Sequence, residues 1–468
     1  MGARVKPEGP RQEQSGSSAP NDTAPHPARI GLWEQFLSRE NLLRALKRVE
    51  RNGGAPGADG MSVDQLRPWL LSHWPRLRDQ LDAGTYPPQP VRRVTIPKVS
   101  GGVRMLGVPT VLDRMIQQAL LQVLTPVFEP HFHDHSFGFR PGRSPHQAVE
   151  RARQFISDGT AWVVDLDLDS FFDRVGHDVL MARIARRVYD RRVLGLIRRY
   201  LSAGVVLDGI QRPSEEGTPQ GSPLSPLLAN VMLDDLDWEL DRRGHRFVRY
   251  ADDLMVYVRS GRAATRVMVS ITEFVERTLR LRVNRGRSAV APAGRRTFLG
   301  FGFSARNGEV RLRIDPRARS RARGRLRQLT SRTWGVPMAR RLVAINRFTR
   351  GWSAYFALAD TPSVFAELDE WLRRRLRQVR WKEWKRPATR RRALTARGIP
   401  PRSAQEWSGS RRGPWRIAGS APLQRALPNA YWRQLGLVGF TEPYQRFRDA
   451  TRTARCGPAC RVVWEGPG

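Results

Sequence analysis

Apolar residues along the chain recur with two different periods, and these periods predict a mixture of helices and strands. In residues 33–49 and 111–127 they return every three or four positions, which predicts amphipathic helices. The same spacing appears again in residues 365–386. Residues 91–109 instead alternate on both sides of Ser-Gly-Gly, which predicts a β-hairpin. The pattern therefore predicts an α+β protein.

The order of these patterns divides the chain into four segments. Residues 1–30 are rich in Gly, Pro, Ser and Ala, as is typical of a disordered leader. Strand and helix patterns mix in residues 31–305, whereas only helical spacing occurs in residues 306–390. Residues 391–468 are rich in Arg, Gly, Pro and Trp, and no pattern there is strong enough to place elements. We expect this last segment to be a basic C-terminal extension and a candidate for DNA binding.

The charge balance points to a polyanionic partner. Lys and Arg total 81 against 44 Asp and Glu, which gives a formal net charge of +37. Arg supplies nearly all of the positive charge, and its planar guanidinium suits bidentate contacts with phosphate. An excess of this size predicts nucleic-acid binding that weakens steeply with salt, because binding releases counterions.

The cysteine content and the hydropathy of the chain indicate the cellular compartment in which it is expected. The two cysteines, Cys456 and Cys460, are too few for a disulfide framework and are typical of a reducing cytoplasm. Alone they supply only two of the four ligands that a structural zinc site takes. The chain shows neither an apolar signal core nor an apolar run of about 18 residues. We therefore expect a cytoplasmic, nucleoid-associated protein without a membrane span.

Three aspartates form the candidate catalytic site. Residues 249–258 predict two strands joined at a turn, with Asp252 and Asp253 at its tip. Adjacent carboxylates repel each other unless a cation lies between them, and Mg²⁺ prefers such oxygen ligands. Taken alone, the turn could be a solvated loop. A second apolar run ends at Asp167, however, and a strand that brings Asp167 to this turn would form a cage for two Mg²⁺ ions about 3.5–4 Å apart.

These motifs resemble a known family. Tyr-Ala-Asp-Asp at 250–253, with Asp167 followed by Phe171 and Phe172, is similar to reverse transcriptases, especially those encoded by bacterial group II introns. Residues 53–61 resemble the start of these enzymes, and residues 351–356 resemble their thumb or maturase domain. The resemblance implies a right-hand polymerase fold, with fingers and palm of α+β type and an α-helical thumb.

The resemblance also implies an activity and its residues. We expect an RNA-directed DNA polymerase that binds group II intron RNA, promotes its splicing and supports its mobility by target-primed reverse transcription. Its partners would be intron RNA, an RNA template with a DNA primer, target DNA and dNTPs. The catalytic and metal-binding residues would be Asp167, Asp252 and Asp253. The dNTP-binding residues would be Lys98 and Arg104 on the triphosphate, Phe172 against the sugar C2′, and Gln220 beside the base pair.

Candidate nucleic-acid contacts lie in two further places. The alternating histidines of residues 131–135 could indicate a metal site, but the following Gly-Phe-Arg-Pro-Gly-Arg-Ser resembles the family's fingers segment. We therefore expect Arg140 and Arg143 to contact nucleic acid. The helix of residues 365–386 interleaves cations with tryptophans, a combination that binds phosphates and stacks on bases. Its predicted contact residues are Arg373, Arg374, Arg377, Arg380 and Trp381.

Two departures from the family pattern leave alternatives open. Arg287 stands where the family usually has Lys, a candidate proton donor to the departing pyrophosphate, and Arg is a poorer acid. The Cys pairs and His cluster of a His-Asn-His nuclease are missing, as in the class C-like branch. The alternatives are a splicing cofactor with little polymerase activity and a domesticated reverse transcriptase that serves repair or phage defence. The intact aspartates argue against the first.

Overall fold

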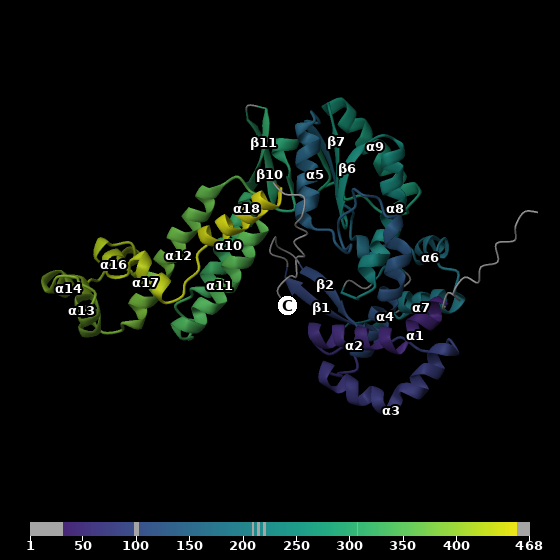
Figure 1. Ribbon diagram of the computed structural model, residues 1–468, viewed down its shortest axis with the longest axis horizontal. Coiled ribbons are helices and arrows are strands. Elements are labelled where there is room, and N and C mark those ends of the chain that lie inside the picture. Colours follow the sequence, from purple (N-terminus) through teal and green to yellow (C-terminus); the bar gives the residue numbers. More distant parts are fainter. Residues whose placement is uncertain are drawn as a thin grey trace, which may run out of the picture.

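The computed structural model describes residues 31–97, 103–207, 210–212, 216–218, 221–306 and 308–455. Figure 1 shows an elongated molecule, with an N-terminal helical end, a central sheet region and a helical arm that extends away from them. The N-terminal end consists of α1 (Leu32–Leu37), α2 (Arg39–Asn52), α3 (Val63–Asp82) and α4 (Val111–Phe128). The leader predicted for residues 1–30 lies outside the described residues.

The first sheet contains the predicted hairpin. Its strand order is β2-β1-β4-β5, formed by β1 (Val91–Pro97), β2 (Val103–Val108), β4 (Val205–Leu207) and β5 (Ile210–Arg212). Strands β1 and β2 are antiparallel, and β4 joins β1 in parallel. The backbone of Arg104 pairs with Ile96, whereas Lys98 lies outside the described residues. The hairpin is thus confirmed.

The central sheet is antiparallel, with strand order β6-β7-β3-β8. It consists of β3 (Trp162–Leu166), β6 (Arg246–Tyr250), β7 (Asp253–Val258) and β8 (Ala289–Pro292). Side chains alternate between its faces. Val164 and Leu166 share one buried cluster with α8 (Ser225–Arg242) and α9 (Gly261–Arg277), whereas Val163 shares another with α5 (Pro145–Ser157). Burial of both faces fixes the register, because a one-residue slip would exchange them.

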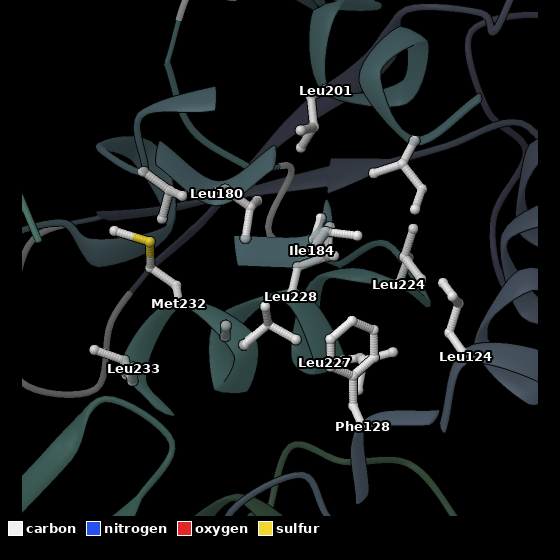
Figure 2. Close-up of a cluster of buried hydrophobic side chains, with 14 of the residues drawn as sticks. Leu124, Phe128, Leu180, Ile184, Leu201, Leu224, Leu227, Leu228, Met232 and Leu233 are labelled. Atoms are coloured by element: carbon white, nitrogen blue, oxygen red, sulfur yellow. The ribbon is translucent and has the colours of Figure 1, made fainter. Parts of the chain in front are cut away.

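Helix α8 lies at the centre of the first cluster. Around it are α6 (His177–Ala185) and α7 (Arg191–Ser202). Figure 2 shows leucines of both helices, and Phe128 of α4, next to the buried leucines of α8. Burying one such side chain contributes about 1.5–3 kcal/mol. This packing makes α8 a rigid support for the strand β6 that follows it.

A third sheet and a helical arm complete the chain. The sheet consists of β9 (Thr297–Phe298), β10 (Phe301–Arg306) and β11 (Glu309–Ile314), and short 3₁₀ turns lie at η1 (Glu129–His131), η2 (Phe171–Asp173) and η3 (Ala293–Arg295). The arm contains α10 (Pro316–Leu329), α11 (Met338–Tyr355), α12 (Pro362–Glu383), α13 (Pro387–Thr395), α14 (Pro401–Ser408), α15 (Pro414–Ala418), α16 (Ala421–Ala426), α17 (Asn429–Gln434) and α18 (Thr441–Arg455).

The last helix returns to the arm's long helices. The Asp369 carboxylate on α12 accepts hydrogen bonds from the backbone N–H groups of Phe440 (2.6 Å) and Thr441 (3.1 Å), which fixes the start of α18. The segment in which the sequence placed no elements is therefore helical up to Arg455 and packs on its neighbour. No helix in the described part of the chain is long and apolar enough to cross a membrane.

The alternating histidines take part in aromatic packing. His133 is buried and lies with its ring 5.1 Å from Trp238, while the His135 ring lies 5.2 Å from Phe155 and 5.4 Å from Phe247. The pKa of His135 is lowered from 6.5 to about 4. Burial is the largest cause, and the charges of His133 and Arg151 add to the decrease.

This shift predicts a loss of stability in mild acid. Between about pH 6.5 and pH 4 the unfolded chain binds a proton at His135 that the folded chain excludes, so the free energy of unfolding falls as the pH falls. Urea unfolding at pH 7 and pH 5 should therefore show a smaller loss for His135→Phe than for the wild type. The exposed His131→Phe is the control, and an equal loss in all three proteins would contradict the prediction.

Candidate active site

The turn between β6 and β7 carries two of the predicted carboxylates. Tyr250 pairs with Asp253, so Ala251 and Asp252 form the tip. Ala251 has a φ of 59°, in the left-handed region, which costs a residue with a Cβ roughly 1–2 kcal/mol. Surrounding contacts must hold this conformation.

Arg249, which directly precedes the turn, supplies those contacts. Its side chain is 1% exposed and forms a two-pronged ion pair with the fully buried Asp237 of α8, at 2.7 Å from Nε and 2.5 Å from the second nitrogen. The remaining nitrogen donates to the carbonyl oxygen of Ala251 at 2.9 Å. The guanidinium thus joins the turn to the rigid helix beneath it.

Asn230 of α8 extends this contact to a third segment. Its side-chain oxygen accepts from Arg249 at 3.0 Å, and its nitrogen donates to the carbonyl of Gly138 at 2.9 Å. Gly138 lies so close to the turn that a Cβ there would overlap the backbone of Ala251. We call Arg249, Asp237 and Asn230 the Arg249 network. The sequence prediction missed this network, although Arg249, which directly follows the apolar pair Phe247 and Val248, was the available signal.

Asp167 lies beside the same turn. Strand β3 pairs with β7 up to Leu166 and Leu254, so the next position in register places Asp167 opposite Asp253. Its Oδ2 atom is buried and has no hydrogen-bond partner, and the nearest cation is Arg287 at 3.9 Å. Desolvation raises the pKa of Asp167; the charge of Arg287 and a hydrogen bond from Asn284 oppose the increase, and the charge of Asp252 adds to it.

The carboxylates repel one another. The pKa of Asp253 is raised to about 7. Desolvation is the largest cause, and repulsion from Asp252, Asp165 and Asp167 adds to it. Asp253 is exposed as a residue, so water screens part of this repulsion. Asp165 instead forms an ion pair with Arg296, which agrees with its omission from the predicted cage.

These features fit a divalent cation. No set of three acidic, His or Cys side chains closes around a single point in the described part of the chain. An unpartnered buried carboxylate oxygen and mutually raised pKa values nevertheless mark a place where a cation would relieve charge. The donors are all oxygen atoms, which suits Mg²⁺.

The predicted nucleotide contacts are described only in part. Phe171 is 3% exposed and belongs to the core, whereas the neighbouring Phe172 is partly exposed, as a residue that meets a ligand must be. Their rings meet edge to face at 5.2 Å. The Arg104 side chain and the whole of Gln220 lie outside the described residues.

Arg140 does not have the predicted role. It is 8% exposed, pairs with Glu129 at 2.9 Å and donates to the carbonyls of His133 and Ser136 at 2.6 and 2.8 Å. Its guanidinium therefore holds its own loop together. Arg143 is more accessible, although it pairs with Asp134 at 2.6 Å. Of the two predicted contacts, only Arg143 remains available to nucleic acid.

The predicted nucleic-acid contacts of α12 also need correction. Trp381 is 3% exposed, and Arg377 is 9% exposed and donates to the carbonyl of Ala418 at 2.8 Å. Arg374 stacks on Trp415 at 4.1 Å, and Arg380 pairs with Glu383 at 2.6 Å. The interleaved cations and aromatics thus attach α15 and its neighbours to α12. Of the predicted residues of this helix, Arg373 is half-buried and remains a candidate contact.

Exposed cations gather instead beside α15. A groove of about 740 Å³ lies between the loop after α10, α12 and α15, and none of the described residues that line it is acidic. Its basic lining residues are Arg332, Arg411, Arg412 and Arg416. A larger hollow of about 1120 Å³ lies along α5 and the β10–β11 hairpin, but it has a mixed-charge lining and none of the three candidate catalytic carboxylates.

The burial of Arg377 predicts a structural effect. Arg377→Met should leave the Ala418 carbonyl unsatisfied and lower the free energy of unfolding by about 1–3 kcal/mol. Arg373→Met on the same helix should change stability by less than about 0.5 kcal/mol. Chemical unfolding of both variants tests this, and equal stabilities would contradict the assigned contact.

Two family models match successive parts of the chain. "Reverse transcriptase (RNA-dependent DNA polymerase)" matches residues 96–303, which include the central sheet and its three aspartates. "Group II intron, maturase-specific domain" matches residues 319–398, which include α11, α12 and α13.

Individual relatives agree with these matches. Protein YkfC of Escherichia coli (strain K12) is 31% identical over 354 residues, which cover 66% of this chain and 92% of YkfC. Group II intron-encoded protein LtrA of Lactococcus lactis subsp. cremoris is 39% identical over 214 residues, which cover 44% of this chain and 34% of LtrA. The chain thus spans about a third of LtrA.

A solved structure, a partial Cas6-RT-Cas1–Cas2 complex, matches at 23% identity and a TM-score of 0.34, over 53% of this chain and 43% of that one. The assignment rests on the sequence matches alone. The chain belongs to the reverse transcriptases that carry a group II intron maturase domain, and it is an RNA-directed DNA polymerase.

Proposed function

We propose that the protein extends a DNA primer on an RNA template at Asp167, Asp252 and Asp253, and that it binds group II intron RNA to promote splicing and mobility. The observation that carries the proposal is the unpartnered, buried oxygen of Asp167 at the end of the strand that pairs with β7. Arg287 lies 3.9 Å from the same oxygen and offsets only part of its charge, so a bound cation would complete its coordination.

The reaction joins the primer to an incoming dNTP. The primer 3′-oxygen forms a bond to the α-phosphorus, the bond from that phosphorus to the bridging oxygen breaks, and pyrophosphate leaves with the proton passing to solvent. Asp167 and Asp252, with Asp253 beside them, would hold two Mg²⁺ ions. These ions supply charge neutralisation at the attacking and leaving oxygens.

The remaining residues would select and orient the nucleotide. We propose that Phe172 excludes a ribose 2′-hydroxyl, that Lys98 and Arg104 bind the triphosphate, and that Gln220 lies beside the new base pair. Support comes from Phe172, which is the accessible member of the aromatic pair. Arg287, 3.9 Å from Asp167, would contribute positive charge rather than a proton.

The domain division is part of the proposal. A boundary at residue 305 would cut the paired strands β10 and β11, so we place the end of the polymerase part at Asp315, immediately before α10. A boundary at residue 390 would likewise cut α13, so we propose that residues 316–398, up to the end of the maturase match, form the helical thumb or maturase domain. The acid-free groove beside α15 would bind phosphates of intron RNA or target DNA, in place of the buried cations of α12.

Removal of one carboxylate tests the chemistry. Asp252→Asn should lower primer extension on poly(rA)/oligo(dT) with Mg²⁺ by at least about 10³-fold, because the metal loses a charged ligand. RNA affinity should remain within about twofold, since the groove cations are unchanged. The matched control is Asp178→Asn, an exposed residue outside the site. Full activity of Asp252→Asn would contradict the assignment.

The effect of the Arg249 network on the rate of primer extension should be separable from its effect on the free energy of unfolding. Arg249→Met alone leaves Asp237 buried and unpaired, which costs about 3–5 kcal/mol of unfolding free energy. The double variant Arg249→Met/Asp237→Leu removes both charges and should regain most of that stability. It should still extend primers at least about tenfold more slowly, because Ala251 loses its donor.

A half-buried ion pair provides the control for this experiment. Arg183 is buried and joins α6 to the half-buried Asp235 of α8 at 3.0 Å. Arg183→Met/Asp235→Leu should therefore extend primers at nearly the wild-type rate. If the Arg249→Met/Asp237→Leu protein is stable and fully active, the network does not position the turn.

A further inference from the structure

The loop that carries Phe172 is bound along its backbone by residues 216–218. The N–H of Thr218 donates to the carbonyl of Phe172 at 2.6 Å, and the N–H of Gly217 donates to the carbonyl of Val175 at 2.9 Å. Gly176 and Glu216 form a β-bridge between the same two segments. The backbone of Phe172 is thus fixed by a segment that lies far from it in sequence.

Gly217 permits this close approach. It has a φ of 93°, and a Cβ at this position would lie 2.9 Å from the carbonyl oxygens of both Phe172 and Asp173. The main chains are therefore in direct contact, with no side chain between them. Any displacement of residues 216–218 must be transmitted to the backbone of Phe172.

The His177 side chain adds a further contact to residues 216–218. It is 5% exposed, begins α6, and its Nε2 lies 2.8 Å from the carbonyl oxygen of Gly217. A carbonyl can only accept, so Nε2 carries the proton in this contact. Helix α6 is anchored in the core by Leu180 and Ile184, which are fully buried (Figure 2). The imidazole therefore joins the segment to a rigid element.

We propose that His177 is a positioning residue that sets the discrimination between dNTPs and rNTPs. The proposal rests on the proposed function, because it acts through Phe172 as the residue that excludes the 2′-hydroxyl. Steric exclusion of one oxygen atom depends on displacements well below its diameter. Loss of the His177 donor leaves the Gly217 carbonyl unsatisfied in a buried place, and residues 216–218 then move away from α6. The bond from Thr218 to Phe172 moves with them, and the gap beside the sugar widens.

The same segment leads directly into Pro-Gln-Gly at 219–221, which the sequence resemblance assigns to the nascent base pair. A purely structural histidine would influence extension with both kinds of nucleotide equally. A positioning histidine changes their ratio, and that ratio is the quantity to measure.

The test uses the full chain on an RNA template whose first unpaired base is cytosine, with dGTP and GTP as substrates. His177→Phe keeps the ring volume but removes the donor, and it should lower the ratio of kcat/KM for dGTP to that for GTP by about tenfold. His177→Gln retains an N–H donor and should restore most of the ratio. His131→Phe, on an exposed residue, is the control.

Separate outcomes distinguish this inference from the proposed function. If Phe172→Ala lowers the ratio and a folded His177→Phe leaves it unchanged, the inference is wrong while the proposed gate stands. If Phe172→Ala itself leaves the ratio unchanged, the gate assignment is the part that fails. Should His177→Phe not fold, Gly217→Ala tests the same contact from the other side, because its Cβ must displace Phe172. An unchanged ratio in Gly217→Ala would also overturn the inference.

Discussion

The ion pair between Arg249 and Asp237 is the contact on which the geometry of the candidate active site depends. Both side chains are buried, so their interaction is barely screened by solvent, and the loss of either would leave an unpaired charge in the interior. The pair also holds Ala251 in a left-handed conformation that its Cβ disfavours. Because Asp237 belongs to α8, the position of the turn follows from the packing of that helix in the core. Core packing and catalytic geometry are thus connected through one guanidinium.

The three candidate carboxylates near the turn repel one another instead of being paired. There Asp167, Asp252 and Asp253 carry like charges close together, and Asp167 has an oxygen with no partner. The protein stabilises the backbone of this region with a paired charge, whereas among the described residues the candidate carboxylates have one cation within 4 Å, Arg287 at 3.9 Å from Asp167. In our proposal such a site would bind a cation for the same reason that it is unfavourable without one. The folded chain would provide the ligand set, and the energy of cation binding would offset the repulsion.

The sequence predicted several local elements well, because the hydrophobic period is a local property. The hairpin of β1 and β2 and helix α4 follow from patterns a few residues long, whereas the choice of the three carboxylates and of Phe172 rests on the resemblance to a family and stays a prediction. The roles of Arg140 and Arg377 could not be predicted in this way. An arginine that binds a backbone carbonyl and one that binds a phosphate look alike in sequence, since guanidinium suits both acceptors. Only the tertiary arrangement decides between them.

The central claim is that the carboxylates held beside the Arg249 network bind the catalytic ions. The most direct measurement is the anomalous scattering of Mn²⁺ in crystals of the complex with an RNA template, a chain-terminated DNA primer and a dNTP. Our account predicts Mn²⁺ at about 2 Å from carboxylate oxygens of Asp167 and Asp252, with the primer end and the dNTP α-phosphate adjacent. Manganese bound elsewhere, with these two carboxylates unligated and the primer end next to other residues, would contradict it.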